Sequence, residues 1–136
     1  MRVVIDTNVF VSSFFGGKPR KVIDLWKKGK ITICLTPCII EEYIDVLRRL
    51  GLEEEPEIGE LIDLLAQGYH ISFIAKTPSL KIVRKDPADD KFIECAVALK
   101  AEVIITGDKD LKAIRDYLGT KILNPEEFLS LFHRSK

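Results

Sequence analysis

The chain has 136 residues, of which 46% are hydrophobic and 31% are charged, an ordinary composition for a globular domain with a core of useful size. Its 21 basic and 21 acidic side chains give a formal net charge of zero, which excludes strong overall attraction to nucleic acid or anionic membranes. No apolar run reaches the roughly 20 residues that span a bilayer, and the first residues lack the layout of a signal peptide. We therefore expect a single domain over residues 1–136 that is cytoplasmic and not bound to a membrane.

Short β-branched apolar runs recur along the chain, and most are continuous rather than alternating, which is typical of strands buried on both faces of a parallel sheet. These runs cover residues 2–5, 31–35, 70–74, 103–106 and 121–123. Helical patterns lie between and after them, over residues 19–29, 37–50, 56–67, about 86–100 and 125–132. The alternation predicts an α/β fold in which helices cover both faces of a parallel sheet.

Two of the predicted strands end at an aspartate. Asp6 follows the first strand, and Asp108 follows the fourth, with Asp110 two residues further on. In open α/β sheets, ligands bind outside the carboxyl ends of the strands, so both positions lie on the functional edge. An aspartate after a strand also caps the helix that follows, and this structural explanation suffices for either residue alone. Two such residues on one edge make a functional site an equal alternative.

Further acidic residues lie on two of the predicted helices. Three of them stand where the helix ending near residue 100 begins: Asp86, Asp89 and Asp90. One of the three is enough for a cap, and all of them favour the positive end of the helix dipole. At about 100° per residue, Asp90 lies at the border of the apolar arc of its helix. Glu41 and Glu42 flank opposite borders of the apolar face of the helix at 37–50, and periodicity does not choose between them.

Several converging carboxylates predict a bound cation, because like charges a few ångströms apart disfavour ionisation. Carboxylate oxygens without a nearby histidine or cysteine suit Mg²⁺ or Mn²⁺. One or two such ions activate a water and stabilise the leaving oxygen in phosphodiester cleavage. Asn8 and Thr106 are polar neighbours of the strand-end aspartates that would orient ligands or metal-bound waters.

The acidic segments, taken in order, resemble the PIN-domain family. They read "DTNVF" at the N-terminus, then "EEYIDVL", "DDKFIECA" and "IITGDKDL". The C-terminal "ILNPEEFL" resembles the tail of PIN-type toxins of prokaryotic toxin–antitoxin systems. The resemblance extends from Arg2 to about Leu131. It implies a three-layer α/β/α fold with a five-stranded parallel sheet and a Mg²⁺- or Mn²⁺-dependent endoribonuclease. It also implies an RNA substrate, an antitoxin partner and a homodimer.

The resemblance also implies which residues form the site. The catalytic and metal-binding acids would be Asp6, Glu42, Asp90 and Asp108. Glu42 is preferred over Glu41 because the family glutamate precedes a bulky apolar residue, here Tyr43. Asp89 or Asp86, in the same segment "DPADD", would be able to share the role of Asp90. The matching supporting positions are Asn8, Thr106 and, as a further ligand, Asp110.

Basic side chains near the predicted site would hold the RNA backbone by phosphate contacts, which do not read sequence. Taken singly, each is better explained as a solvated surface charge. The candidates are Lys18, Arg20, Lys21, Lys109, Lys112 and Arg115.

Two other functions compete with the nuclease. The first is a catalytically silent RNA- or protein-binding module with the same fold. The second is a phosphatase or phosphotransfer domain in which Asp6 is the nucleophile or phospho-acceptor. A phosphatase of the haloacid dehalogenase type would have a second aspartate two residues later, where this chain has Asn8. That substitution favours the nuclease.

Overall fold

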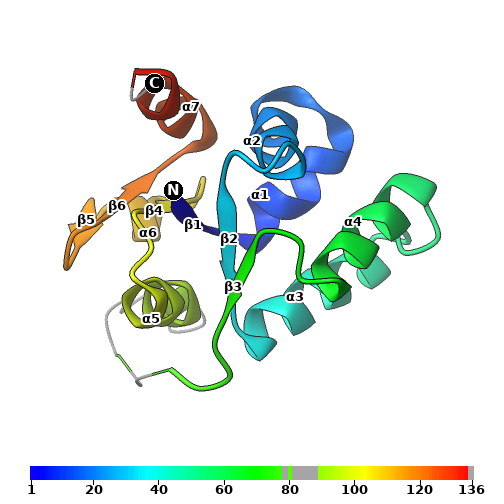
Figure 1. Ribbon diagram of the computed structural model, residues 1–136, viewed down its shortest axis with the longest axis horizontal. Coiled ribbons are helices and arrows are strands. Elements are labelled where there is room, and N and C mark those ends of the chain that lie inside the picture. The colour runs from blue at the N-terminus through cyan, green and yellow to red at the C-terminus, as the bar shows by residue number, and fades with distance from the viewer. Residues whose placement is uncertain (78–79, 81–88, 135–136) are drawn as a thin grey trace.

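A mostly parallel sheet forms the centre of the computed structural model, which describes residues 1–77, 80 and 89–134. Within these residues the sheet has six strands in the order β3-β2-β1-β4-β6-β5 (Figure 1). The strands are β1 (Arg2–Ile5), β2 (Thr32–Leu35), β3 (Ile71–Phe73), β4 (Val103–Ile105), β5 (Asp116–Tyr117) and β6 (Thr120–Leu123). The predicted α/β class is confirmed, and each of the five predicted strands corresponds to an observed one.

The predicted count of five strands, all parallel, is wrong. The sixth strand, β5, pairs antiparallel with β6 at one edge of the sheet. The turn between them consists of Leu118 and Gly119, which both have positive φ angles, as the tight turns of β-hairpins require. β5 is only two residues long and contains an exposed aspartate, so no apolar run marks it in the sequence.

The register of the central strands brings their carboxyl ends together. β1 runs parallel to β4 with Ile5 opposite Ile105, and it runs parallel to β2 on its other side. The side chains of Val3 and Val4 are fully buried, as expected for a strand covered on both faces. Asp6 and Thr106 directly follow the paired ends of β1 and β4, so the two residues are neighbours across the sheet.

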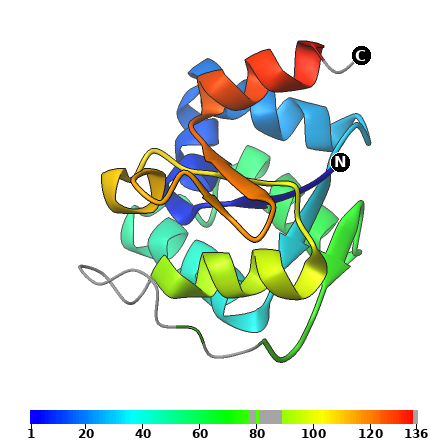
Figure 2. The same ribbon diagram turned by 90° about the vertical axis from the view of Figure 1, so that its left-hand side faces the viewer.

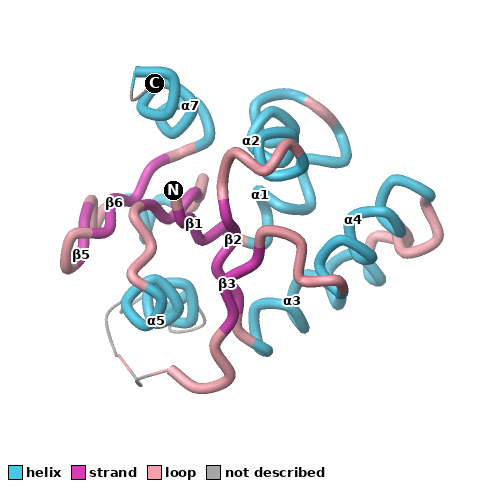
Figure 3. The backbone as a smooth tube through the Cα atoms, viewed as in Figure 1, coloured by secondary structure: helices cyan, strands magenta, loops and turns pink. Residues whose placement is uncertain are grey.

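Helices cover both faces of the sheet, which confirms the predicted three-layer arrangement (Figures 1 and 2). On one side, α2 (Gly17–Lys27) and α7 (Pro125–Arg134) pack against each other, and α7 contacts β4 and β6. On the other side, α5 (Asp90–Leu99) packs against β1, β2 and β4. As predicted, two helices, α3 (Pro37–Arg49) and α4 (Pro56–Ala66), come between β2 and β3 in the chain, and both lie to the right of these strands in Figure 3. Across the described ranges, no helix has the length and apolarity to cross a membrane.

The helix boundaries follow local signals where the structure describes them. Thr36 caps α3, because its hydroxyl accepts a hydrogen bond from the Ile39 N–H at 3.4 Å. α7 begins with a reciprocal pair in which Asn124 and Glu127 each accept a bond from the other's backbone N–H. The predicted start of α5 at Asp86 lies outside the described residues.

Three short helical segments lie outside the predicted set, because none is long enough to show a helical period. They are α1 (Thr7–Ser12), the 3₁₀ segment η1 (Ser13–Phe15) and α6 (Lys109–Lys112). α1 begins directly after Asp6 and α6 directly after Asp108, so each aspartate occupies the N-cap position of a helix. The hydrogen bonds of each carboxylate therefore show whether it caps the helix that follows.

Candidate functional site

Asp6 stands at the end of β1 with its side chain turned toward β4. Its backbone N–H donates to the Ile105 carbonyl at 3.0 Å, which continues the ladder between the two strands. Its carboxylate accepts a 2.5 Å hydrogen bond from the Thr106 hydroxyl. The backbone N–H of Asn8 lies near the carboxylate, but the Asp6 side chain makes no capping hydrogen bond to α1. Asp6 is only 5% exposed, and a cap does not explain why a carboxylate is buried here.

Burial is the main reason that the pKa of Asp6 is raised above its usual 3.8. The carboxylates of Asp108 and Glu42 raise the pKa further, while the Thr106 hydroxyl and the Asn8 amide lower it. Three of the four predicted acids are thus close enough to interact through their charges. The fold holds the carboxylates of Asp6, Glu42 and Asp108 near one another, and their mutual repulsion disfavours the ionised form of Asp6. We call these three residues the acidic cluster.

Asp108 is joined to Asp6 through one hydroxyl group. The Thr106 hydroxyl, which is fully buried, accepts a 3.0 Å hydrogen bond from the Asp108 N–H and donates to Asp6. The Asp108 carboxylate also caps α6 by accepting from the Leu111 N–H at 2.9 Å. Asp108 therefore caps a helix and also lies close to the Asp6 carboxylate.

Glu42 reaches the cluster from α3. One of its carboxylate oxygens accepts a hydrogen bond from the Thr7 hydroxyl, and the other pairs with the Lys91 ammonium at 2.8 Å. The next residue, Tyr43, is buried, and its hydroxyl donates to the Ile5 carbonyl at the end of β1. This contact anchors α3 beside Asp6, which gives a physical reason for a bulky residue after the glutamate.

The remaining acids of the two helices differ in their surroundings. Glu41 is exposed, whereas Glu42 is half-buried and contacts Thr7 and Lys91. Asp90 is 7% exposed in the first turn of α5, and the next residue, Lys91, pairs with Glu42 of α3. Asp89 is half-buried at the N-cap position of α5, whereas Asp86 lies outside the described residues.

Thr7 and Lys91 contact Glu42 directly, yet sequence reasoning named neither of them. Thr7 is the middle residue of "DTN" and is 3% exposed, so a buried polar residue between two site residues was an available signal. Lys91 follows Asp90 in "DDKF", but only the packing of α5 beside α3 brings its ammonium to Glu42.

An open cleft of about 700 Å³ lies beside Asp108. The predicted supporting residues Asn8 and Asp110 line it, whereas Thr106 is buried behind it. The other lining residues come from α1, α2, α6 and α7 or the segments just before them: Val9, Ser12, Pro19, Gly107, Lys109 and Pro125. The acidic cluster therefore borders a cleft that can admit a ligand.

The donor set fits a hard divalent cation, because it consists of carboxylate oxygens without a histidine or cysteine. A cation would also offset the cost of holding Asp6 beside two other carboxylates. As the side chains stand, no group of three or more His, Cys, Asp or Glu residues could hold a metal ion within 1–77, 80 and 89–134. In this arrangement Thr7 and Lys91 contact the two carboxylate oxygens of Glu42.

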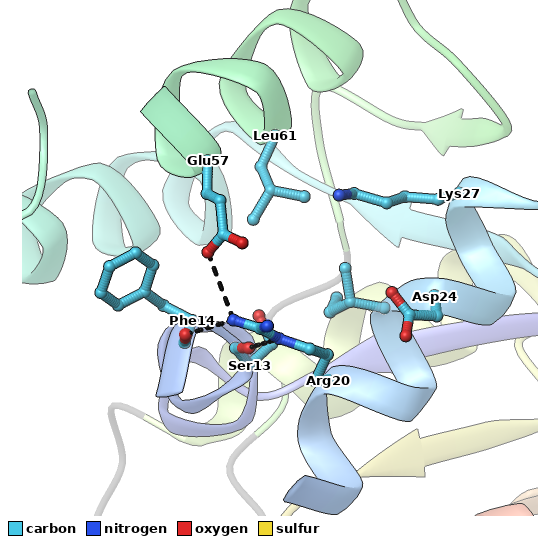
Figure 4. A pocket seen from close by; sticks show the side chains of 8 residues that line it. Ser13, Phe14, Arg20, Asp24, Lys27, Glu57 and Leu61 are labelled. Carbon is cyan, nitrogen blue, oxygen red and sulfur yellow. Dashed lines mark hydrogen bonds and ion pairs between the residues drawn. The ribbon is translucent and has the colours of Figure 1, made fainter. Parts of the chain in front are cut away.

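Some of the basic candidates bind other groups of the protein, and the rest are exposed. Arg20 donates to the Ser13 and Phe14 carbonyls of η1 and pairs with Glu57 of α4 at 3.2 Å (Figure 4). That network lies in a separate small pocket between α2 and α4, so Arg20 has a structural role. Lys112 pairs with Glu127 at 2.7 Å. Of the six candidates, Lys109 lines the cleft. The other three are exposed: Lys18, Lys21 and Arg115.

Two comparisons with known proteins bear on the family of this chain. A family model described as "PIN domain" matches residues 2–110. The uncharacterized protein MJ1680 of Methanocaldococcus jannaschii is 34% identical over 148 residues, covering 98% of this chain and 93% of that protein. PIN domains are generally nucleases, and PIN-domain nucleases generally use divalent metal ions.

Proposed function

This chain belongs to the PIN-domain family, and from that membership we propose that it is an endoribonuclease that cleaves RNA phosphodiester bonds with Mg²⁺ or Mn²⁺. The observation that carries the proposal is the junction of two strand ends. One buried hydroxyl, that of Thr106, joins Asp6 to Asp108, and the Glu42 carboxylate is close enough to Asp6 to raise its pKa. A hard divalent cation would stabilise several carboxylates that lie close together at the carboxyl edge of a parallel sheet.

Asp6, Glu42, Asp90 and Asp108 would hold the cation through carboxylate oxygens. When bound, such an ion lowers the pKa of a water and stabilises the leaving oxygen of the phosphodiester. The Thr106 hydroxyl bonds Asp6 and the Thr7 hydroxyl bonds Glu42, so these two hydroxyls would orient the carboxylates toward the cation. Asn8 and Asp110 line the cleft beside Asp108, where they would orient water or a further ligand.

The cleft beside Asp108 would receive the RNA strand. Lys109 lines it and is exposed, which suits a phosphate contact that reads no sequence. A cleft open to solvent admits a single-stranded segment more readily than an enclosed pocket would. With a net charge of zero, the chain would depend on such local contacts for RNA affinity.

A role as the toxin of a toxin–antitoxin pair, with an antitoxin partner, rests on the resemblance of "ILNPEEFL" to PIN-type toxins. We further propose a homodimer, as the family resemblance implies, and a cytoplasmic location. We also propose that residues 1–136 form one domain. In support, residues beyond the matched 2–110 form β6, which pairs with β4, and α7, which packs on α2.

The experiment is a cleavage assay on single-stranded RNA with Mg²⁺, with Mn²⁺ and with EDTA. Cleavage should require the metal. It should fall in Asp6→Asn by more than the about 10–100-fold typical of losing a supporting partner. Glu41→Gln is the matched control, since Glu41 is exposed on the helix that carries Glu42, and it should keep full activity.

Metal-independent cleavage, or full activity in Asp6→Asn, would overturn the nuclease proposal. RNA binding without cleavage under any metal would instead support the silent binding module. A phosphodonor-derived adduct on Asp6 would support the phosphotransfer alternative.

A further inference from the structure

We propose that Lys91 is a positioning residue of the acidic site: its ammonium holds Glu42 and competes with a divalent cation for that carboxylate. The inference rests on the proposed metal-dependent function. It concerns how tightly the site binds its metal rather than which reaction follows.

The contact joins two helices that carry predicted ligands. Lys91 extends from the first turn of α5, next to Asp90, and its Nζ lies 2.8 Å from Oε1 of Glu42 on α3. The Thr7 hydroxyl holds the other oxygen of Glu42. A metal ion that binds Glu42 would therefore approach a carboxylate whose negative charge the lysine already partly neutralises. The charged partner is the one whose loss changes the electrostatics.

Burial distinguishes this ion pair from the others. The side chains of Lys91 and Glu42 are 17% and 32% exposed. In each of the four other ion pairs found between described residues, both side chains are at least 31% exposed and one is at least 48% exposed. Exposed pairs contribute little because water and salt screen them, whereas a pair removed from water interacts more strongly.

A second contact limits where the ammonium can lie. Lys91 Nζ stands 5.4 Å from the centroid of the Phe92 ring, which is within the range of a cation–π interaction. Phe92 itself is 1% exposed, so the ring is part of the core. The ammonium is thereby held next to the Glu42 carboxylate, where it partly neutralises that negative charge.

The test is Mn²⁺ binding by calorimetry, which needs no RNA and no turnover. Lys91→Met keeps the aliphatic stem and removes the charge, so we expect Mn²⁺ to bind about tenfold more tightly than to the wild-type protein. Lys91→Arg should stay near the wild-type affinity. Lys27→Met is the matched control, since Lys27 pairs with Glu60 at 3.3 Å, between α2 and α4. It should leave Mn²⁺ affinity unchanged.

Thermal unfolding separates competition from a merely structural role. Lys91→Met should lower Tm in EDTA, because the carboxylates then lie near neither the lysine ammonium nor a metal ion. Mn²⁺ should restore Tm to the wild-type value. A Tm loss of equal size with and without Mn²⁺, together with unchanged Mn²⁺ affinity, would overturn the proposal.

A double-mutant cycle identifies the carboxylate involved. In a Glu42→Gln background, Lys91→Met should no longer tighten Mn²⁺ binding, and an undiminished gain there would also overturn the inference. If the wild-type protein binds Mn²⁺ but Lys91→Met does not tighten it, the inference fails and the proposed function stands. If the wild-type protein binds no Mn²⁺, both fail.

Discussion

The ends of β1 and β4 lie side by side, and both continue into an aspartate at a helix N-cap, yet the two carboxylates bind different partners. Asp108 caps α6 through the Leu111 N–H and remains half-buried at the edge of the cleft. Asp6 leaves the cap of α1 incomplete, is almost fully buried, and accepts from the Thr106 hydroxyl. An N-cap position therefore does not tell whether an aspartate caps, because the neighbouring strand can offer its carboxylate a better partner.

The largest effect should come from the group that joins the two strand ends. Thr106→Val removes the hydroxyl and leaves both the Asp6 carboxylate and the Asp108 N–H without that partner in a buried place. We expect a loss of about 1–3 kcal/mol in the free energy of unfolding, measured by urea denaturation. Cleavage should fall by about 10–100-fold.

Thr106→Ser keeps the hydroxyl and is the control, with stability and cleavage close to those of the wild-type protein. If Thr106→Val matched Thr106→Ser in both measurements, the two strand ends would not depend on the hydroxyl that joins them.

A smaller effect should follow from the cap at the β4 end. Asp108→Ala removes the bond to the Leu111 N–H, so we expect a loss of about 1 kcal/mol in the free energy of unfolding. Asp108→Asn can still cap α6 and should lose only a few tenths of a kcal/mol, also by urea denaturation. Both variants should lose cleavage, because neither supplies a carboxylate. Equal stabilities of the two variants would show that the cap contributes nothing.

The smallest effect should appear at the β1 end, as a change with pH. The pKa of Asp6 is raised above 3.8 in the folded protein, so the folded state keeps this proton to a higher pH than the unfolded chain does. Protonation of Asp6 therefore stabilises the wild-type protein at low pH, and this contribution is lost as pH rises through the folded pKa.

Asp6→Asn lacks this titration and can still accept from Thr106. Urea denaturation in EDTA should therefore show the variant gaining stability relative to the wild-type protein as pH is raised from about 3.8. A flat difference, or one that favours the wild-type protein at higher pH, would contradict a raised pKa for Asp6.

Much of the fold could be predicted because its signals are local. Continuous apolar runs marked β1, β2, β3, β4 and β6, whereas β5 carries an exposed aspartate and has no such run. Among the candidate site residues, Asp6 and Asp108 followed from strand ends alone. Glu42 followed only from the resemblance, because Glu41 and Glu42 lie at opposite borders of the same apolar face. The Tyr43 hydroxyl bound to the Ile5 carbonyl turns Glu42 toward the site, and periodicity does not contain that contact.

By itself, the sequence determined that two aspartates end parallel strands at one edge of an α/β sheet, because strand patterns and chain order depend on neighbouring residues. Only the tertiary structure decided what those carboxylates bind. The Thr106–Asp6 bond joins residues 100 positions apart, and the Thr7–Glu42 bond joins residues 35 positions apart. Lys91 reaches Glu42 only because α5 packs beside α3. Such contacts depend on the register of β1 with β4 and on helix packing, which no local pattern encodes.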